Sequence, residues 1–174
     1  MVTLFTIVLV ATAAERVAEL VVSLRNARWA FAHGGVEYGR GHYPWMIAAH
    51  TGLLVGALVE VQVRGGTPPA PWVLSTLAVV LASQALRWWC ITTLGRQWNT
   101  RVIVVPGLPL VADGPYRLVR HPNYVAVAVE GLALPLMGGA WITAVLFTAA
   151  NAVLLTVRIR CEDAALRESA ARPA

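Results

Sequence analysis

The sequence predicts an all-α integral membrane protein with about five transmembrane helices, and three observations support this fold class. Hydrophobic residues make up 57% of the 174 residues, charged residues make up 13%, and the mean hydropathy is +0.62. A soluble domain carries about 25% charged residues, so we expect a single membrane domain over residues 1–174. Five stretches approach the roughly 20 apolar residues that a membrane-crossing helix needs. They are residues 2–22, 44–63, 70–94, 122–137 and 139–157.

The first two predicted spans carry features beyond plain hydrophobicity. The second half of the first span contains Glu15, Arg16 and Glu19, which makes it the least regular of the five. No basic region precedes it and no small-residue cleavage site follows, so we expect a retained helix rather than a removed signal peptide. The second span contains Gly52-x-x-x-Gly56, a spacing that lets helices approach closely, and we expect it to serve packing within one molecule.

The fourth and fifth spans are predicted to form a hairpin. The fourth is short and contains Pro135, and Gly138-Gly139 then makes a tight turn into the fifth. Segments 122–137 and 139–157 therefore form either a full helical hairpin or a partly re-entrant one.

The arginines predict the orientation in the membrane. All 14 basic residues are arginine, and eleven of them fall in segments 23–43 and 95–121 or after the last span. Only Arg64 falls in the loops of the opposite side. The positive-inside rule places the arginine-rich side in the cytoplasm. The net charge of +5 is explained by this topology, so we expect no nucleic-acid partner. The cysteines and histidines lack metal-type spacing, so we expect no metal.

A polar segment precedes the fourth span. Residues 114–124 read Gly-Pro-Tyr-Arg-Leu-Val-Arg-His-Pro-Asn-Tyr, and Pro122 suits the first turn of a helix. Helix N-termini carry partial positive charge and free N–H groups, which attract anionic groups. Arg and Tyr also serve as plain interfacial anchors. Because anchoring does not require a histidine and an asparagine around a tight turn, we interpret the segment as facing a cofactor.

A second polar group lies at the end of the fifth span. Arg158 and Glu162 are four residues apart and share a helix face, followed by Asp163. One interpretation is a basic flank with a salt bridge. Together with segment 114–124, a functional interpretation is favoured: the arginine holds a substrate oxygen or carboxylate, and the glutamate pairs with a cation or acts as a base.

Two further features leave alternatives open. Asn99, within the Gly95–Arg101 segment, either lines the same cavity or belongs to an interfacial Trp/Arg belt. Glu130 falls inside the fourth span, where ionisable residues are usually paired or functional. It either forms a structural pair with Arg87 or activates a hydroxyl nucleophile. Near the outer edge, Glu60 and Arg64 are expected to form a surface pair.

The C-terminal motifs resemble those of the isoprenylcysteine carboxyl methyltransferase family. That pattern is roughly Gly-Pro-Tyr-x-x-x-Arg-His-Pro-x-Tyr, an apolar hairpin, and then Arg-x-x-x-Glu-Glu. The N-terminal half is similar to a bacterial branch whose members methylate phenolic lipids or alkylpyrones and are often encoded beside type III polyketide synthases. The residues that carry this second likeness are Glu15-Arg16, Ser23-x-x-Asn26, Gly35-x-Glu37, His42-Tyr43-Pro44-x-Met46 and His50.

The resemblance implies S-adenosylmethionine as methyl donor, bound within about residues 95–166 at the cytoplasmic face of a bacterial inner membrane protein. A lipophilic substrate would enter from the bilayer, and a functional link to a type III polyketide synthase is expected. The residues expected to bind the cofactor are Asn99, Tyr116, Arg120, His121, Pro122, Asn123 and Tyr124. Arg158 and Glu162 are expected at the reaction centre, with Glu130 as a second candidate base.

Two departures from the family pattern bear on the substrate. Asp163 replaces the second glutamate, and no Gly-x-x-Tyr-x-x-Tyr segment follows Leu166. We therefore expect O-methylation of a phenolic or pyrone hydroxyl rather than of a prenylated cysteine carboxylate, which is the alternative enzyme hypothesis. A membrane scaffold or lipid-binding subunit is the non-catalytic alternative. A phenol has a pKa near 10 and benefits from a base, whereas a carboxylate needs none.

Overall fold

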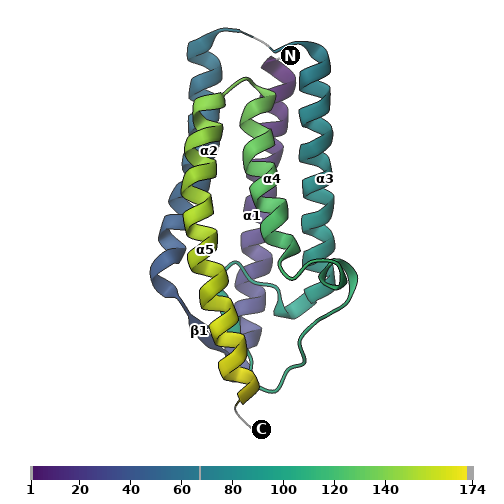
Figure 1. Ribbon diagram of the computed structural model, residues 1–174, viewed down its shortest axis with the longest axis vertical. Coiled ribbons are helices and arrows are strands. Elements are labelled where there is room, and N and C mark those ends of the chain that lie inside the picture. The colour runs from purple at the N-terminus through teal and green to yellow at the C-terminus, as the bar shows by residue number, and fades with distance from the viewer. Residues whose placement is uncertain (1, 67, 172–174) are drawn as a thin grey trace.

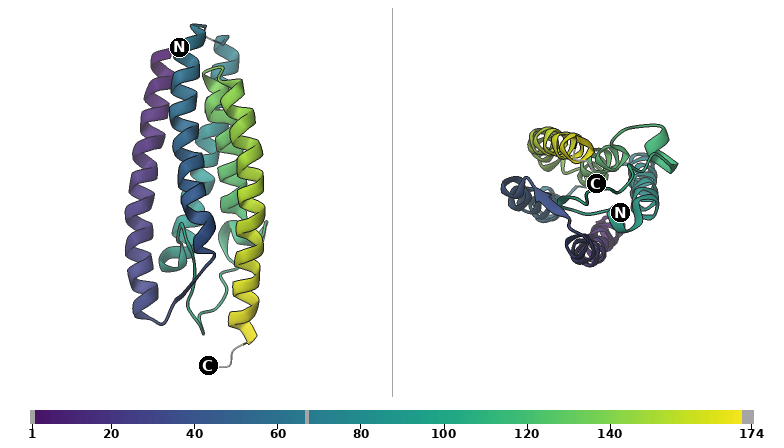
Figure 2. Two further views of the ribbon diagram at one scale, coloured as in Figure 1. Left: turned by 90° about the vertical axis from the view of Figure 1, so that its left-hand side faces the viewer. Right: turned by 90° about the horizontal axis from the view of Figure 1, so that it is seen from below.

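The computed structural model describes residues 2–66 and 68–171, and these residues form a bundle of five long helices (Figure 1). The helices are α1 (Val2–Ala32), α2 (Tyr43–Arg64), α3 (Ala70–Leu94), α4 (Pro122–Met137) and α5 (Trp141–Ala171). The predicted all-α membrane fold is confirmed. The left view of Figure 2 shows α1 at one edge of the bundle and α5 at the other.

Three of these helices are long and apolar enough to cross a membrane: Arg40–Arg64 and Ala70–Gln97, which include an adjoining 3₁₀ turn, and Trp141–Ser169 within α5. Helix α1 has 31 residues, but Glu15, Arg16 and Glu19 interrupt its apolar run. Helix α4 has 16 residues and a length of about 24 Å, short of the roughly 30 Å hydrocarbon core. Both lie alongside the other three helices (Figure 1).

Helices α1 and α5 run well past the predicted ends of their spans. The first continues from residue 22 to Ala32, and the last continues from residue 157 to Ala171. Charged residues end the apolar run without ending a helix, and neither extension contains Gly or Pro, the residues that most disfavour helix. The helices thus project beyond the apolar layer at the arginine-rich end.

The connections divide between the two ends of the bundle as the arginine pattern predicts. One end holds the α2–α3 loop, the α4–α5 turn and the start of α1 (Figure 1). The other holds three short 3₁₀ turns, η1 (Arg40–His42), η2 (Gly95–Gln97) and η3 (Gly114–Arg117). It also holds a two-stranded antiparallel sheet that spacing alone did not predict. Strand β1 (Val36–Tyr38) pairs with β2 (Val102–Val104) in the register Val36 to Val104.

The α4–α5 hairpin turns as the two glycines predict. Pro135 lies near the end of α4, and its carbonyl accepts the N–H of Ala140 at 2.9 Å. Gly139 has a φ of 80°, which L side chains rarely adopt. A Cβ at Gly138 would lie 2.5 Å from Val61 and 2.9 Å from Phe5. The turn therefore packs directly onto the apolar core of the bundle, which also contains Leu134 and Met137.

Glu60 fixes the start of α5. Its carboxylate accepts the backbone N–H groups of Ile142 at 3.0 Å and Thr143 at 2.8 Å, and so caps the helix from α2. The predicted Glu60–Arg64 pair is confirmed at 3.4 Å, and Arg64 also donates to the Gly139 carbonyl at 3.0 Å. This end of the bundle is held by a cap, a salt bridge and apolar packing.

Two glycines in the spans give a matched test of packing. A Cβ at Gly131 on α4 would overlap the ring of Phe147 on α5, whereas nothing lies within 4 Å of one at Gly52. We expect Gly131→Ala to lower the free energy of unfolding in detergent by about 1–3 kcal/mol, the usual effect of overpacking, and so to lower the melting temperature. Gly52→Ala should leave it unchanged or raise it. Equal melting temperatures for the two variants would contradict this packing.

Candidate functional site

A chain of hydrogen bonds joins α4 to α5 at the arginine-rich end of the bundle. The Nε of Arg158 donates to the Tyr124 hydroxyl at 2.8 Å, and that hydroxyl donates to the Glu162 carboxylate. The guanidinium also lies over the Tyr124 ring, 5.5 Å from its centroid. Arg158 is 4% exposed and Tyr124 is 9% exposed. The structure therefore brings together Arg158 and Glu162, which were predicted at the reaction centre, and Tyr124, which was predicted to bind the cofactor.

Backbone carbonyls from the α3–α4 connection complete the environment of Arg158. Its Nη1 donates to the Thr100 carbonyl and its Nη2 to the Asn99 carbonyl at 3.3 Å. The sulfur of Met46 on α2 lies 3.5 Å from Nη1. A buried cation needs such partners, because an unpaired charge in apolar surroundings is strongly unfavourable. Most of the guanidinium donors are therefore occupied by the protein.

His121 stands beside this chain, at the residue before α4. Its ring stacks on Tyr124 with centroids 5.4 Å apart, and its Nε2 lies 3.4 Å from the Asp163 carboxylate. A residue before proline favours extended backbone, and Pro122 then starts the helix as predicted. The histidine, the tyrosine and the two acids thus form one surface across the α4–α5 junction.

Asn99 makes contacts that hold the loop rather than face open space. Its Oδ1 accepts from the Ser23 hydroxyl at 2.8 Å, and its Nδ2 donates to the Ser23 carbonyl at 3.2 Å. Asn26, one turn further along α1, donates to the Trp98 carbonyl at 2.7 Å. From the sequence, Ser23-x-x-Asn26 carried only part of a family likeness, and the structure shows that these two residues attach the loop whose carbonyls receive Arg158.

The other predicted cofactor-binding residues are less tightly engaged. Tyr116 hydrogen-bonds with Cys90 of α3, and burial raises the pKa of its phenol, so it stays protonated. Arg120 is exposed. The Oδ1 of Asn123 is buried without a hydrogen-bond partner among the described residues. A buried, unpaired acceptor is unusual in a native protein and marks a place for a ligand donor or water.

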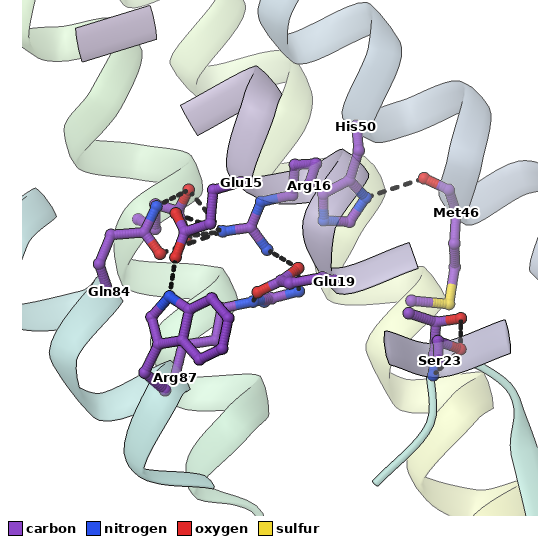
Figure 3. Close-up of polar contacts among 11 residues, drawn as sticks. Glu15, Arg16, Glu19, Ser23, Met46, His50, Gln84 and Arg87 are labelled. Atoms are coloured by element: carbon purple, nitrogen blue, oxygen red, sulfur yellow. Dashed lines mark hydrogen bonds and ion pairs between the residues drawn. The ribbon is translucent and has the colours of Figure 1, made fainter. Parts of the chain in front are cut away.

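A separate charged network around Arg16, Glu19 and Arg87 lies inside the bundle (Figure 3), and Glu130 belongs to it through its contact with Arg16. Arg16 of α1 reaches Glu130 at 2.7 Å, and Gln84 donates to the same carboxylate at 3.3 Å. The predicted pair between Glu130 and Arg87 is wrong, because the ion-pair partner of Glu130 is Arg16. A helix segment of six residues, about 9 Å, separates Tyr124 from Glu130. The structure therefore does not bring Glu130 to Arg158 and Glu162.

Glu19 is the centre of that network. It is 2% exposed, and it accepts from Arg16 at 2.8 Å and from Arg87 through two guanidinium nitrogens. At the rim, Glu15 accepts from the indole N–H of Trp88. In lipid the hydrophobic effect does not drive two apolar helix faces together. Polar contacts of this kind therefore matter more for the attachment of α1 than they would in water. The network attaches α1 to α3 and α4.

The network predicts unequal effects of two neighbouring substitutions. Glu19→Gln leaves the buried guanidinium of Arg87 without a counter-charge, and we expect it to destabilise the protein by about 3–5 kcal/mol. Glu15→Gln is the matched control, since glutamine can still accept from Trp88, and its effect should be much smaller. Thermal unfolding in detergent measures both. Equal losses for the two variants would show that the Glu19–Arg87 pair does not dominate.

Comparison with known proteins places this site within a family. The model of the isoprenylcysteine carboxyl methyltransferase (ICMT) family matches residues 76–168, more than half of the chain, including Tyr124, Arg158 and Glu162. An uncharacterized protein of Bacillus subtilis (strain 168), YpbQ, is 42% identical over 154 residues, which cover 88% of this chain and 91% of that protein.

An uncharacterized protein of Haemophilus influenzae is 25% identical over 154 residues, covering 88% of this chain and 89% of its own. No solved structure matches the chain. The resemblance that the C-terminal motifs indicate is confirmed by the family match. The chain belongs to the isoprenylcysteine carboxyl methyltransferase family, a family of membrane methyltransferases.

Proposed function

We propose that the protein is an integral membrane O-methyltransferase that uses S-adenosylmethionine to methylate a hydroxyl group of a lipophilic small molecule, such as a phenolic or pyrone lipid. The observation that carries this proposal is the Arg158–Tyr124–Glu162 chain at the junction of α4 and α5, within the segment that matches the methyltransferase family. We infer that this chain lies near the edge of the apolar layer, within reach of both a water-soluble cofactor and a lipid.

The residues around the junction fit the chemistry of S-adenosylmethionine. When bound, the cofactor supplies an electrophilic methyl group on a sulfonium cation. The carboxylates of Glu162 and Asp163 suit a nearby positive charge. The unpaired Oδ1 of Asn123 can accept a hydrogen bond from an amino or hydroxyl group, and the partial positive charge at the start of α4 suits a carboxylate. His121 and Tyr116 would border the same site.

The contacts of Arg158 favour a hydroxyl acceptor over a carboxylate. A carboxylate is best held by two parallel guanidinium N–H groups. In this structure all three nitrogens of Arg158 already donate hydrogen bonds, which the Tyr124 hydroxyl and the carbonyls of Thr100 and Asn99 accept. A prenylated cysteine carboxylate would have to displace these partners and approach Glu162, which carries the same charge. A phenolic oxygen needs only one donor.

Tyr124 and Glu162 then have an orienting role. The Tyr124 hydroxyl accepts from Arg158 and donates to Glu162, so its proton is directed away from the arginine. This fixes the guanidinium and the carboxylate relative to one another at the end of α4. Methyl transfer is an in-line displacement, in which alignment and exclusion of water supply much of the rate enhancement.

The proposed orientation places this end of the bundle in the cytoplasm of a bacterial inner membrane. The loops with most arginines and the Arg158 site lie at the same end (Figure 1). Basic residues stay on the cytoplasmic side during insertion. That side also holds the cell's soluble S-adenosylmethionine.

Transfer of label from methyl-labelled S-adenosylmethionine tests the proposal in purified, detergent-solubilised protein. The acceptors are an alkylresorcinol, an alkylpyrone and a farnesylated cysteine analogue, each assayed alone. We expect label in a phenolic or pyrone acceptor and a loss on the order of 100-fold or more in Glu162→Gln. Asp113→Asn, an exposed acid in the nearby loop, should behave as wild type. Label only in the cysteine analogue would support the alternative acceptor, and no transfer with no cofactor binding would favour a scaffold.

A second variant addresses cofactor binding alone. His121 lies against Tyr124 and near Asp163, so His121→Ala removes one wall of the proposed cofactor site. We expect its affinity for S-adenosylmethionine, measured by calorimetry, to fall about tenfold or more, equivalent to at least about 1.4 kcal/mol. His33→Ala, on an exposed ring at the end of α1, is the control. Unchanged affinity in His121→Ala would move the cofactor away from this loop.

A further inference from the structure

His42 is a buried imidazole for which the proposed reaction has so far no use. It ends η1 and precedes α2, and it is 9% exposed. Its backbone N–H donates to the Gly39 carbonyl at 3.3 Å. Within residues 2–66 and 68–171, neither of its ring nitrogens has a hydrogen-bond partner, unlike the ring of His50, which contacts the Met46 carbonyl at 2.8 Å. A ring that is nine-tenths buried, has no hydrogen-bond partner among these residues and does not have its nitrogens fully enclosed is a candidate for contact with a ligand.

The ring packs against α5 beside the Arg158–Glu162 turn. Gly39 has a φ of 62°, and a Cβ there would lie 2.8 Å from Nδ1 of His42 and 2.5 Å from Sγ of Cys161. The imidazole and the thiol therefore approach the same point. Cys161 lies three residues after Arg158 and therefore on the same side of the helix, and it directly precedes Glu162 in the sequence. His42 thus reaches this part of α5 from the N-terminal half of the chain.

The charged and titratable groups around His42 are few. Arg158 is the cation that acts on it from α5, and Cys161 is the other titratable neighbour there. On its own side, Arg40 pairs with Glu37 at 3.2 Å, and Tyr43 hydrogen-bonds with Thr100 at 3.3 Å. Met46, one turn into α2, contacts Arg158. The start of α2 therefore borders the Arg158 site through Met46, as α4 does through Tyr124.

We propose that His42 is the proton acceptor for a hydroxyl substrate held at Arg158. This inference rests on the proposed function and names the base that methylation of a weakly acidic hydroxyl requires. The acceptor O–H bond breaks and its proton moves to a ring nitrogen of His42. The oxygen forms a bond to the methyl carbon as the carbon–sulfur bond breaks and leaves neutral S-adenosylhomocysteine. The imidazolium then returns its proton to water.

The other candidate bases are already engaged. Glu162 accepts from Tyr124, and Glu130 accepts from Arg16 and Gln84 in the separate network. Imidazole has an ordinary pKa near 6.5, and burial together with the nearby Arg158 guanidinium lowers the pKa of His42, so its ring is unprotonated and able to accept a proton at neutral pH. Because His42 lies outside the segment that matches the family model, it would adapt the shared methyl-transfer site to an acceptor that must lose a proton.

The test compares wild type, His42→Gln and His33→Gln with labelled S-adenosylmethionine and an alkylresorcinol between pH 5 and 9. We expect the wild-type rate to fall on the acid side as an imidazole is protonated. His42→Gln should be slower by about 10²- to 10⁴-fold and should lose this acid limb, while its cofactor affinity stays at the wild-type value. His33→Gln should match wild type in all three readouts.

Several results would overturn the assignment. Wild-type rates with an intact acid limb in His42→Gln would do so directly. If that variant does not fold, the wild-type profile decides, because an alkylresorcinol rate without an acid limb excludes a histidine base. Label only in a carboxylate acceptor would remove the role of His42 and leave the protein a methyltransferase. Absence of both cofactor binding and transfer would reject the methyltransferase proposal and the base together.

Discussion

The attachment of α1 to the rest of the bundle depends on the buried ion pairs of Glu19. Two guanidinium groups from different helices, Arg16 and Arg87, share this one carboxylate (Figure 3), and Arg16 also contacts Glu130. In lipid such groups cannot be satisfied by water, so the network forms only when α1, α3 and α4 are all in place. The charges that make the first span look irregular are those that fix its position.

The position of α1 has effects one to two turns further along the helix. Once Glu19 is fixed, Ser23 and Asn26 reach the connection after α3 and bind its backbone and the side chain of Asn99. That connection in turn presents the carbonyls of Asn99 and Thr100 to Arg158. The charged network and the Arg158 site are therefore separate clusters joined by a single rigid helix. A change in the first can disturb the second without touching it.

Sequence patterns predicted the parts of this structure that depend on neighbours along the chain. The bounds of α3 and α4 follow from the apolar runs, and Pro122 and the Gly138-Gly139 pair mark a helix start and a turn. The common face of Arg158 and Glu162 follows from their spacing. The pairing of distant residues does not follow from local patterns. Arg16 and Glu130 are 114 residues apart, and Arg158 and Tyr124 are 34 apart. Several partners were chemically equivalent for Glu130, and only the packing of helices distinguishes Arg16 from Arg87.

Helix α5 is held at two points, and this limits how its sequence can vary. Glu60 binds the backbone at Thr143 near one end, and Arg158 enters the polar site near the other. An α-helix turns about 100° and rises about 1.5 Å per residue. Inserting or deleting a single residue between these points would leave the capped end in place and rotate Arg158 away from the Tyr124 hydroxyl and the carbonyls of Asn99 and Thr100. Substitutions on the lipid-facing side of α5 would leave this spacing intact. The number of residues between the two attachment points of α5, more than the identity of those residues, therefore determines whether the site can assemble.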